Sequence, residues 1–112
     1  MAKGDFVGEF ELCVLLAVGH LGDEAYGVTV RREIEARTGR TIAIGAVYAT
    51  LARLEGKGLV HFRLSDPQPL QGGRARKYFS LTGPGVRAVR HSTEMICRMI
   101  AGLSPKLRGG EW

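Results

Sequence analysis

Residues 41–59, TIAIGAVYATLARLEGKGL, constrain the fold most, because they read as one helix with two different faces. Apolar residues recur there at steps of three and four, which is the spacing of a single stripe on an α-helix. The stripe consists of Ile44, Val47, Leu51 and Leu54. The opposite face is small near its start and basic toward its end, and it carries Ala46, Ala49, Thr50, Arg53 and Lys57.

Two interpretations of this helix are open. A helix that is anchored on one side and slim on the other can enter the major groove of double-stranded DNA, where small side chains allow close approach. The alternative is an ordinary amphipathic helix whose outer face is solvated. By itself the helix favours the ordinary interpretation, so the neighbouring segments must decide.

A second helix is expected just before it, over residues 26–37. Asp23 is a candidate for its N-cap, and Gly39 suits the left-handed position past its C-terminus. Only residues 39–41 then separate the two helices. Two short helices joined by such a turn match the helix-turn-helix pattern.

Two strand candidates, residues 59–64 and 78–81, flank the loop SDPQPLQGG, which is rich in proline, glycine and polar residues. The loop is too long for a two-residue turn, so we expect a β-hairpin with a flexible tip. The hairpin carries the cations Arg63, Arg74, Arg76 and Lys77. A basic hairpin beside a helix-turn-helix is the anatomy of a winged helix, and the 64–78 wing would lie against phosphate.

The first and last helices indicate a second chain. Residues 12–18, LCVLLAV, lie in a helix expected over residues 6–20 and are apolar on every side, which so small a chain can hardly cover. From residue 86 onward, apolar positions alternate steps of three and four in a heptad seam, widened by Met95, Cys97 and Met99. The alternative is that this seam packs onto its own domain. The expected dimer interface is Leu12, Leu16, Val86, Val89, Thr93, Ile96, Ile100 and Leu103.

These elements predict an α+β fold that is mainly α. Residues 1–82 form a winged helix-turn-helix domain of three helices and a two-stranded β-hairpin wing. Thr82 caps a C-terminal dimerisation helix over residues 83–104, with Pro84 in its first turn and Ser104-Pro105 as its stop. Residues 105–112 are expected to be a flexible tail.

Composition narrows the classes of function. The formal net charge of +5 and the pI of about 9.7 favour a polyanion as partner, with nucleic acid ahead of a membrane surface. Cys13 and Cys97 stand in apolar helical contexts and are expected to be two buried small hydrophobes, which fits a cytoplasmic protein. The sequence has no metal-ligand spacing, no membrane span and no catalytic set, so we expect no cofactor and no enzyme.

The chain resembles the PadR-like transcriptional regulators, a branch of the winged helix-turn-helix proteins, from about residue 8 to residue 103. The resemblance is carried by GEFELCVLLAV (8–18), LGDEAYGVTVRREIE (21–35), GAVYATLARLEGKGLV (45–60) and GGRARKYFSLTGPG (72–85). It implies a dimer that binds operator DNA, usually as a repressor, and places this chain in the shorter subgroup with a single C-terminal helix. Ala43 stands where the family often has a capping serine, so either Thr41 caps the helix or its first turn is less well held. Ala75 replaces a proline that is frequent between the arginines of the wing.

The resemblance and the residues together assign candidate roles toward double-stranded operator DNA. Ala46, Ala49, Thr50 and Arg53 are expected to face the groove. Arg53 would pair with a guanine edge or form a salt bridge with an acid such as Glu55 or Glu35. Tyr48 would direct its hydroxyl to a phosphate or be a core aromatic with a wet tip. The remaining candidate contacts, to phosphate or solvent, are Arg40, Thr41, Lys57, Arg74, Arg76 and Lys77.

Two further alternatives stay open. A protein–protein interaction module could keep the winged fold without binding DNA, because fold alone does not settle function. A small hydrophobic effector could occupy a space between subunits, lined by Leu16, Met95, Ile96 or Met99, or the interface could be packed without a ligand. Relatives that bind flat drugs stack them on a tryptophan between the C-terminal helices, whereas the tryptophan of this chain is Trp112, in the tail.

Overall fold

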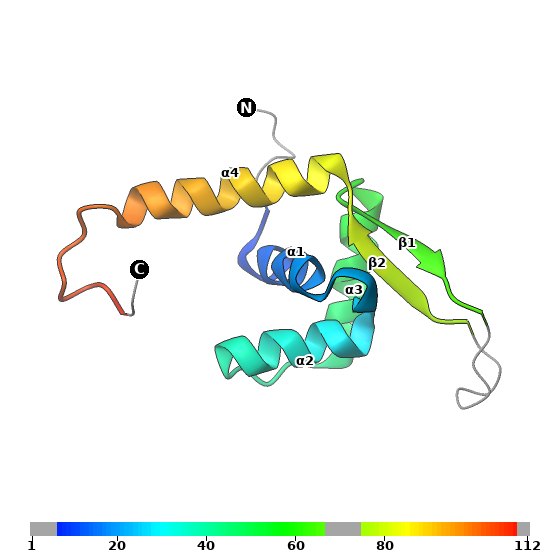
Figure 1. The fold of residues 1–112 in the computed structure, drawn as a ribbon. Coiled ribbons are helices and arrows are strands. Elements are labelled where there is room, and N and C mark those ends of the chain that lie inside the picture. The colour runs from blue at the N-terminus through cyan, green and yellow to red at the C-terminus, as the bar shows by residue number, and fades with distance from the viewer. Residues whose placement is uncertain (1–6, 67–74, 110–112) are drawn as a thin grey trace.

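Helix α1 (Glu9–Leu21) occupies the centre of the fold, and the other elements pack around it (Figure 1). The structure is a computed structural model that describes residues 7–66 and 75–109. After α1 come a 3-10 turn (Gly22–Glu24), α2 (Gly27–Thr38), α3 (Ile44–Gly56), β1 (Val60–Leu64), β2 (Lys77–Leu81) and α4 (Gly83–Ile100). The described part is therefore mainly helical with one antiparallel hairpin, which confirms the predicted winged helix-turn-helix with an added C-terminal helix.

The apolar run of α1 is covered mostly by its own chain. Val14, Leu15, Ala17 and Val18 are buried against α2, α3, the hairpin and the start of α4. Leu16 is exposed and Leu12 is half-buried. The expectation that one chain can hardly cover this helix is thus wrong for most of it, because four elements of the same chain converge on it.

Helix α2 begins one residue later than expected and is capped differently. Tyr26 is its N-cap, and the Tyr26 N–H donates to the Thr29 hydroxyl at 2.9 Å. Asp23 lies in the preceding 3-10 turn, so its prediction as the N-cap is wrong. Gly39 has φ 73° at the C-terminus, which confirms the predicted left-handed end.

The hairpin pairs β1 and β2 in antiparallel register, with Val60 opposite Leu81 and Phe62 opposite Phe79. The pairing continues one step toward the tip, where the Ser65 N–H donates to the Arg76 carbonyl at 2.8 Å. On its other edge β2 is tied to the helical core, because the Phe79 N–H donates to the Ala25 carbonyl at 2.7 Å. The predicted flexible tip falls on residues 67–74, outside the described residues.

Helix α4 begins as predicted. The Thr82 hydroxyl accepts from the Gly85 N–H at 3.0 Å, and Pro84 lies in the first turn. Gly85 lets the helix approach the backbone of the β1 side, since a Cβ there would lie 2.0 Å from the Leu59 carbonyl oxygen. The helix ends at Ile100 rather than at residue 104, because Ala101 leaves the helical conformation and Gly102 has φ 78°.

The first half of α4 packs on α1, and its far half extends beyond the body of the molecule (Figure 1). Ala88 and Ser92 are buried, whereas Met95, Ile96 and Met99 are exposed. Leu103 lies past the end of the helix, so it is not part of a helical seam. Among the seam positions of the first half, Val86 is exposed and Val89 is half-buried, so the alternative in which the seam packs onto its own domain holds only in part.

The two cysteines differ from expectation. Cys13 is half-buried and Cys97 is exposed, so the prediction of two buried small hydrophobes is wrong for Cys97. The apolar seam on which that prediction rested lies largely outside the core in this single chain. Among the helices in residues 7–66 and 75–109, none combines the length and apolar character required to cross a bilayer.

Candidate nucleic-acid interface

Helix α3 has the buried face and the exposed face that its sequence indicates, except that one residue expected on the outer face is buried. Val47, Leu51 and Leu54 are buried, and Ala46 and Ala49 are exposed. Thr50 was expected on the outer face, but it is only 2% exposed, so that placement is wrong. Its hydroxyl has a partner inside, as it accepts from Arg53 Nη2 at 3.3 Å.

The outer face of α3 also includes a residue that the sequence interpretation missed. Ala52 is exposed, and it continues a row of exposed small residues at steps of three and four: Gly45, Ala49, Ala52 and Gly56. The same spacing rule that found the apolar stripe could have found this row. A row without long side chains lets the helix backbone approach a partner closely.

The entry to α3 is held by a carboxylate from α2 rather than by a side-chain cap of its own. Ala43 is its N-cap, and in the part of the chain that the structure describes no side chain caps the helix. Thr41 is exposed and does not take this role. Instead, the Ile42 N–H donates to Glu35 Oε2 at 2.9 Å, which ties the entry of α3 to α2.

Tyr48 joins α3 to the start of α2. Its side chain is 51% exposed, and its ring lies against the backbone of Gly27. A Cβ at Gly27 would come within 2.4 Å of the ring, so this packing requires glycine. A packed ring with an exposed edge fits both interpretations of Tyr48, so the phosphate contact stays a prediction.

An open groove of about 420 Å³ lies where α2, α3 and the wing meet. Its lining combines hydroxyl groups, cations and the first backbone groups of α2. The lining residues are Tyr26, Gly27, Val28, Tyr48, Ala75, Arg76 and Lys77. Such a surface can hold a phosphate group, because backbone N–H groups at a helix start and nearby cations both attract anions.

Aromatic rings fix the cations at the root of the wing. The Arg76 guanidinium lies 4.0 Å from the centre of the Tyr26 ring and donates to the Tyr78 hydroxyl at 3.2 Å. That hydrogen bond is the main reason why the pKa of Arg76 is raised above its ordinary value. Lys77 Nζ lies 4.0 Å from the centre of the Phe62 ring. Arg74, the other predicted wing cation, lies outside the described residues.

The basic residues of α3 are bound to an acid that the sequence did not indicate. Arg53 Nε donates to Glu11 Oε2 at 3.3 Å, and Lys57 Nζ donates to the same oxygen at 2.8 Å. The predicted partners of Arg53, Glu55 and Glu35, are therefore wrong. Glu11 lies 42 and 46 residues before these two cations, and no local pattern links it to them.

Arg40 is also paired, since its Nη1 donates to Glu9 Oε1 at 2.7 Å. Both side chains of this pair are largely exposed. Surface pairs of this kind exchange partners readily, so the Arg40 side chain is available to another anion. The predicted choice between a phosphate contact and a solvated charge for Arg40 is not tested by this geometry.

The predicted dimer surface is apolar and partly open. Leu16 on α1 and Val86, Met95, Ile96 and Met99 on α4 are exposed, with Met99 at 75%. Leu12, Val89, Thr93 and Ile100 are half-buried. The interface itself stays a prediction, because the structure contains one chain.

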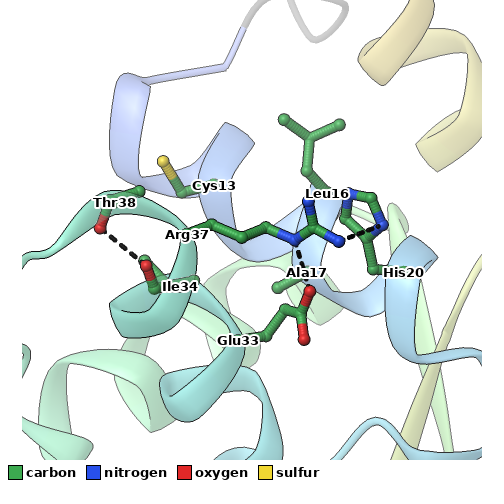
Figure 2. Close-up of a pocket in the computed structure, with 8 residues that line it drawn as sticks. All are labelled: Cys13, Leu16, Ala17, His20, Glu33, Ile34, Arg37 and Thr38. Atoms are coloured by element: carbon green, nitrogen blue, oxygen red, sulfur yellow. Dashed lines mark hydrogen bonds and ion pairs between the residues drawn. The ribbon is translucent and has the colours of Figure 1, made fainter.

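A cavity of about 120 Å³ lies between α1 and α2. Figure 2 shows the residues that line it. Arg37 crosses its mouth, where it pairs with Glu33 and lies 3.2 Å from His20 Nδ1. Leu16 lines the cavity, and Met95, Ile96 and Met99 do not. The cavity is smaller than the ~300–1,000 Å³ typical of sites for drug-sized molecules, so it does not match the predicted effector space.

The PadR-like transcriptional regulator family matches residues 15–91 of this chain. The match is thus to a family of regulators rather than of enzymes. Among proteins with curated functions, none matches the sequence.

Solved structures with this fold are numerous. A transcriptional regulator from Streptococcus is 29% identical, covers 80% of this chain and 83% of its own, and superposes with a TM-score of 0.65. A PadR family regulator from Eggerthella lenta is 26% identical over 87% of this chain and 82% of its own, with a TM-score of 0.64. A PadR-like regulator from Bacillus cereus is 22% identical over 91% and 93%, with a TM-score of 0.67, and supports the fold.

Proposed function

The chain belongs to the PadR-like family of transcriptional regulators, and from that premise we propose that it is a dimeric, cytoplasmic repressor that binds a specific site in double-stranded DNA. In this proposal α3 enters the major groove, and the 64–78 wing contacts the phosphate backbone. Residues 83–104 pair the two chains. The regulated gene and its operator would be identified by the DNA sequence that the protein selects.

The observation that carries the proposal is the exposed small-residue row of α3 beside an open basic groove. The residues of this row leave the outer side of the helix slim enough for the major groove, which is about 12 Å wide: Gly45, Ala49, Ala52 and Gly56. Arg53 lies on the same helix and Lys57 at its C-cap, and both remain partly exposed. A solvated amphipathic helix has no need of such a row, whereas a helix in a groove does.

Tyr48, Arg76 and Lys77 are proposed to contact phosphate from the groove between α2, α3 and the wing. Contacts of this kind fix the position of a protein on DNA but do not read the sequence. The aromatic rings under Arg76 and Lys77 support this role, because they hold the cations in place before DNA arrives. Arg40 is proposed as a further phosphate contact.

The dimer is proposed from the exposed apolar residues of α4 and Leu16. Ile96 and Met99 lie on the far half of the helix, where the described residues leave them 45% and 75% exposed. Two recognition helices in one dimer would read half-sites about 34–36 Å apart. Because the two α4 helices would set the distance between the recognition helices, they would also set the distance between the two half-sites of the operator.

The test is a selection of binding sites from random-sequence DNA, followed by measured affinities at physiological salt. The selected DNA should bind at least about 1,000-fold more tightly than random DNA. Ala49→Glu should abolish binding by placing a carboxylate on the face that meets DNA. Ala36→Glu, an equal change at an exposed position of α2, is the control and should bind. Failure to enrich any sequence would reject the proposal and favour the protein–protein interaction module.

A further inference from the structure

Glu11 is a buried carboxylate at the junction of α1 and α3. Its side chain is 11% exposed, although it belongs to a charged residue type that is rarely buried unless it is paired. Three donors surround it: the Gly8 N–H at 2.9 Å on Oε1, and Lys57 Nζ and Arg53 Nε on Oε2. Arg53 belongs to the helix that is proposed to read DNA, and Lys57 is the C-cap of that helix.

The contacts of Arg53 leave its outer end open. Its Nε donates to Glu11 and its Nη2 to the Thr50 hydroxyl, each at 3.3 Å. A guanidinium has five N–H donors in one plane, and these bonds use one at Nε and one at Nη2. Both N–H groups of Nη1 and the second N–H of Nη2 are left able to donate. The side chain is 55% exposed. This is the end that pairs with O6 and N7 of a guanine.

We propose that Glu11 is a positioning residue that, together with Thr50, holds Arg53 in the orientation that reads one base pair in each half-site. The inference rests on the proposed DNA binding of α3. An arginine on a free side chain would lose rotamer entropy on binding and could contact phosphate or base equally. An arginine whose side chain is already held by Glu11 and Thr50 loses less rotamer entropy on binding and has fewer other contacts to choose from. Its binding free energy therefore favours one base pair over the others.

Glu11 has a second effect through Lys57. A carboxylate that accepts from Lys57 at 2.8 Å neutralises a cation close to the face that meets DNA. Binding to any DNA sequence depends on the number of phosphates that cations neutralise. Glu11 therefore reduces attraction to DNA of any sequence through Lys57. Its support of the Arg53 base contact is the effect that increases the ratio of specific to non-specific binding.

The neighbouring pair of Glu9 and Arg40 offers a matched control. Glu9 lies on the same helix and carries the same charge, but its side chain is 79% exposed and it contacts neither Arg53 nor Lys57. Glu9→Gln removes the charge without changing the support of Arg53. Glu11→Gln removes the same charge and the support together.

The experiment measures dissociation constants for selected operator DNA, for operators with single base-pair changes and for random DNA, at several salt concentrations. In Glu11→Gln, discrimination at one position of each half-site should fall by roughly tenfold, within the range of a bidentate arginine contact. Its affinity for random DNA should rise, with a salt slope steeper by about 0.9 for each freed lysine. Glu9→Gln should raise affinity for random DNA and leave discrimination at that position as in the wild type.

Thr50→Val removes the other support of Arg53 without changing any charge. It should lower discrimination at the same position and leave the salt slope unchanged. If Glu11→Gln does not fold, Thr50→Val still tests whether support of Arg53 determines discrimination at that position. In an Arg53→Ala background, Glu11→Gln should have no further effect on discrimination.

Three outcomes would overturn the inference. Discrimination could stay intact at every position in both variants, or Glu11→Gln could weaken operator and random DNA equally, which would mark a structural role only. A wild-type protein that does not distinguish operator from random DNA would reject the proposed function, and this inference with it. A wild type that discriminates, with variants that discriminate equally, would reject the inference alone.

Discussion

At the scale of the residue, the ionisation of Glu11 links folding to pH. Burial raises the pKa of this carboxyl, but hydrogen bonds from Lys57, the Gly8 N–H and Arg53 outweigh burial, so its pKa lies below the ordinary value. The folded state therefore favours the ionised form more than the unfolded chain does. A group of this kind stabilises the fold above its unfolded pKa, and its contribution is lost as the pH falls through the folded pKa.

We predict that Glu11→Gln lowers the free energy of unfolding near neutral pH and that this deficit shrinks as the pH falls below about 4, the region of an ordinary glutamate pKa. Urea unfolding of both proteins at a series of pH values measures it. Glu9→Gln is the control, because its exposed pair contributes little at any pH. A deficit that stays constant down to about pH 2 would mean that the Glu11 carboxylate does not stabilise the fold through its charge.

At the scale of the element, the wing is a hairpin whose cations are supported by rings from two sides. Tyr26 comes from the N-cap of α2, and its ring meets the Tyr78 ring edge-on with 5.5 Å between centroids. Arg76 lies over the first of these rings and bonds to the second. The orientation of the wing is thus coupled to the start of α2, which in turn carries the ring of Tyr48.

We predict that changing both Arg76 and Lys77 to alanine flattens the plot of log affinity against log salt. If each side chain neutralises one phosphate in each subunit, the slope should fall by roughly 3 to 4 units. Fluorescence anisotropy with labelled operator DNA measures it. Arg90→Ala with Arg98→Ala removes the same charge from exposed positions of α4 and should change the slope much less. An unchanged slope in the wing variant would remove the wing from the interface.

At the scale of the whole molecule, the shape of the chain indicates a partner. Its extents are 54 × 32 × 20 Å, and α4 accounts for much of the elongation because its far half leaves the body (Figure 1). The side chains of Ile96 and Met99 on that half are exposed. Soluble proteins rarely leave contiguous apolar surface uncovered, and a second copy supplies a matching surface by symmetry.

We predict that Ile96→Glu with Met99→Glu converts a dimer into a monomer while far-UV circular dichroism stays the same. Sedimentation equilibrium gives the mass, and the same samples should lose most of their affinity for operator DNA. Arg98→Glu places an acid between the two positions but off the seam, and it should remain dimeric. A wild-type protein that sediments as a monomer would contradict the proposed dimer.

Local pattern predicted much of the fold. The apolar stripe of α3, the left-handed Gly39 and the Thr82 cap depend on neighbours within a few residues, and all three are confirmed. The sequence placed Thr50 on the outer face and did not name Ala52, although Thr50 is buried and Ala52 is exposed. Residues at the border between two helical faces cannot be assigned to either face from spacing alone. The buried Thr50 hydroxyl accepts a hydrogen bond from Arg53, one turn away, so its burial leaves no polar group without a partner.

The sequence by itself determined which segments become helices and strands, because periodicity and caps are encoded within each segment. It also supplied the family, through motifs that cover most of the chain. Only the tertiary structure decided which charges meet. Glu11 pairs with Arg53 and Lys57 across 42 and 46 residues, and no spacing rule reaches that far. The packing of α1 against α3 buries the Glu11 carboxylate, and a buried carboxylate requires donors close to it, which here are Arg53 and Lys57.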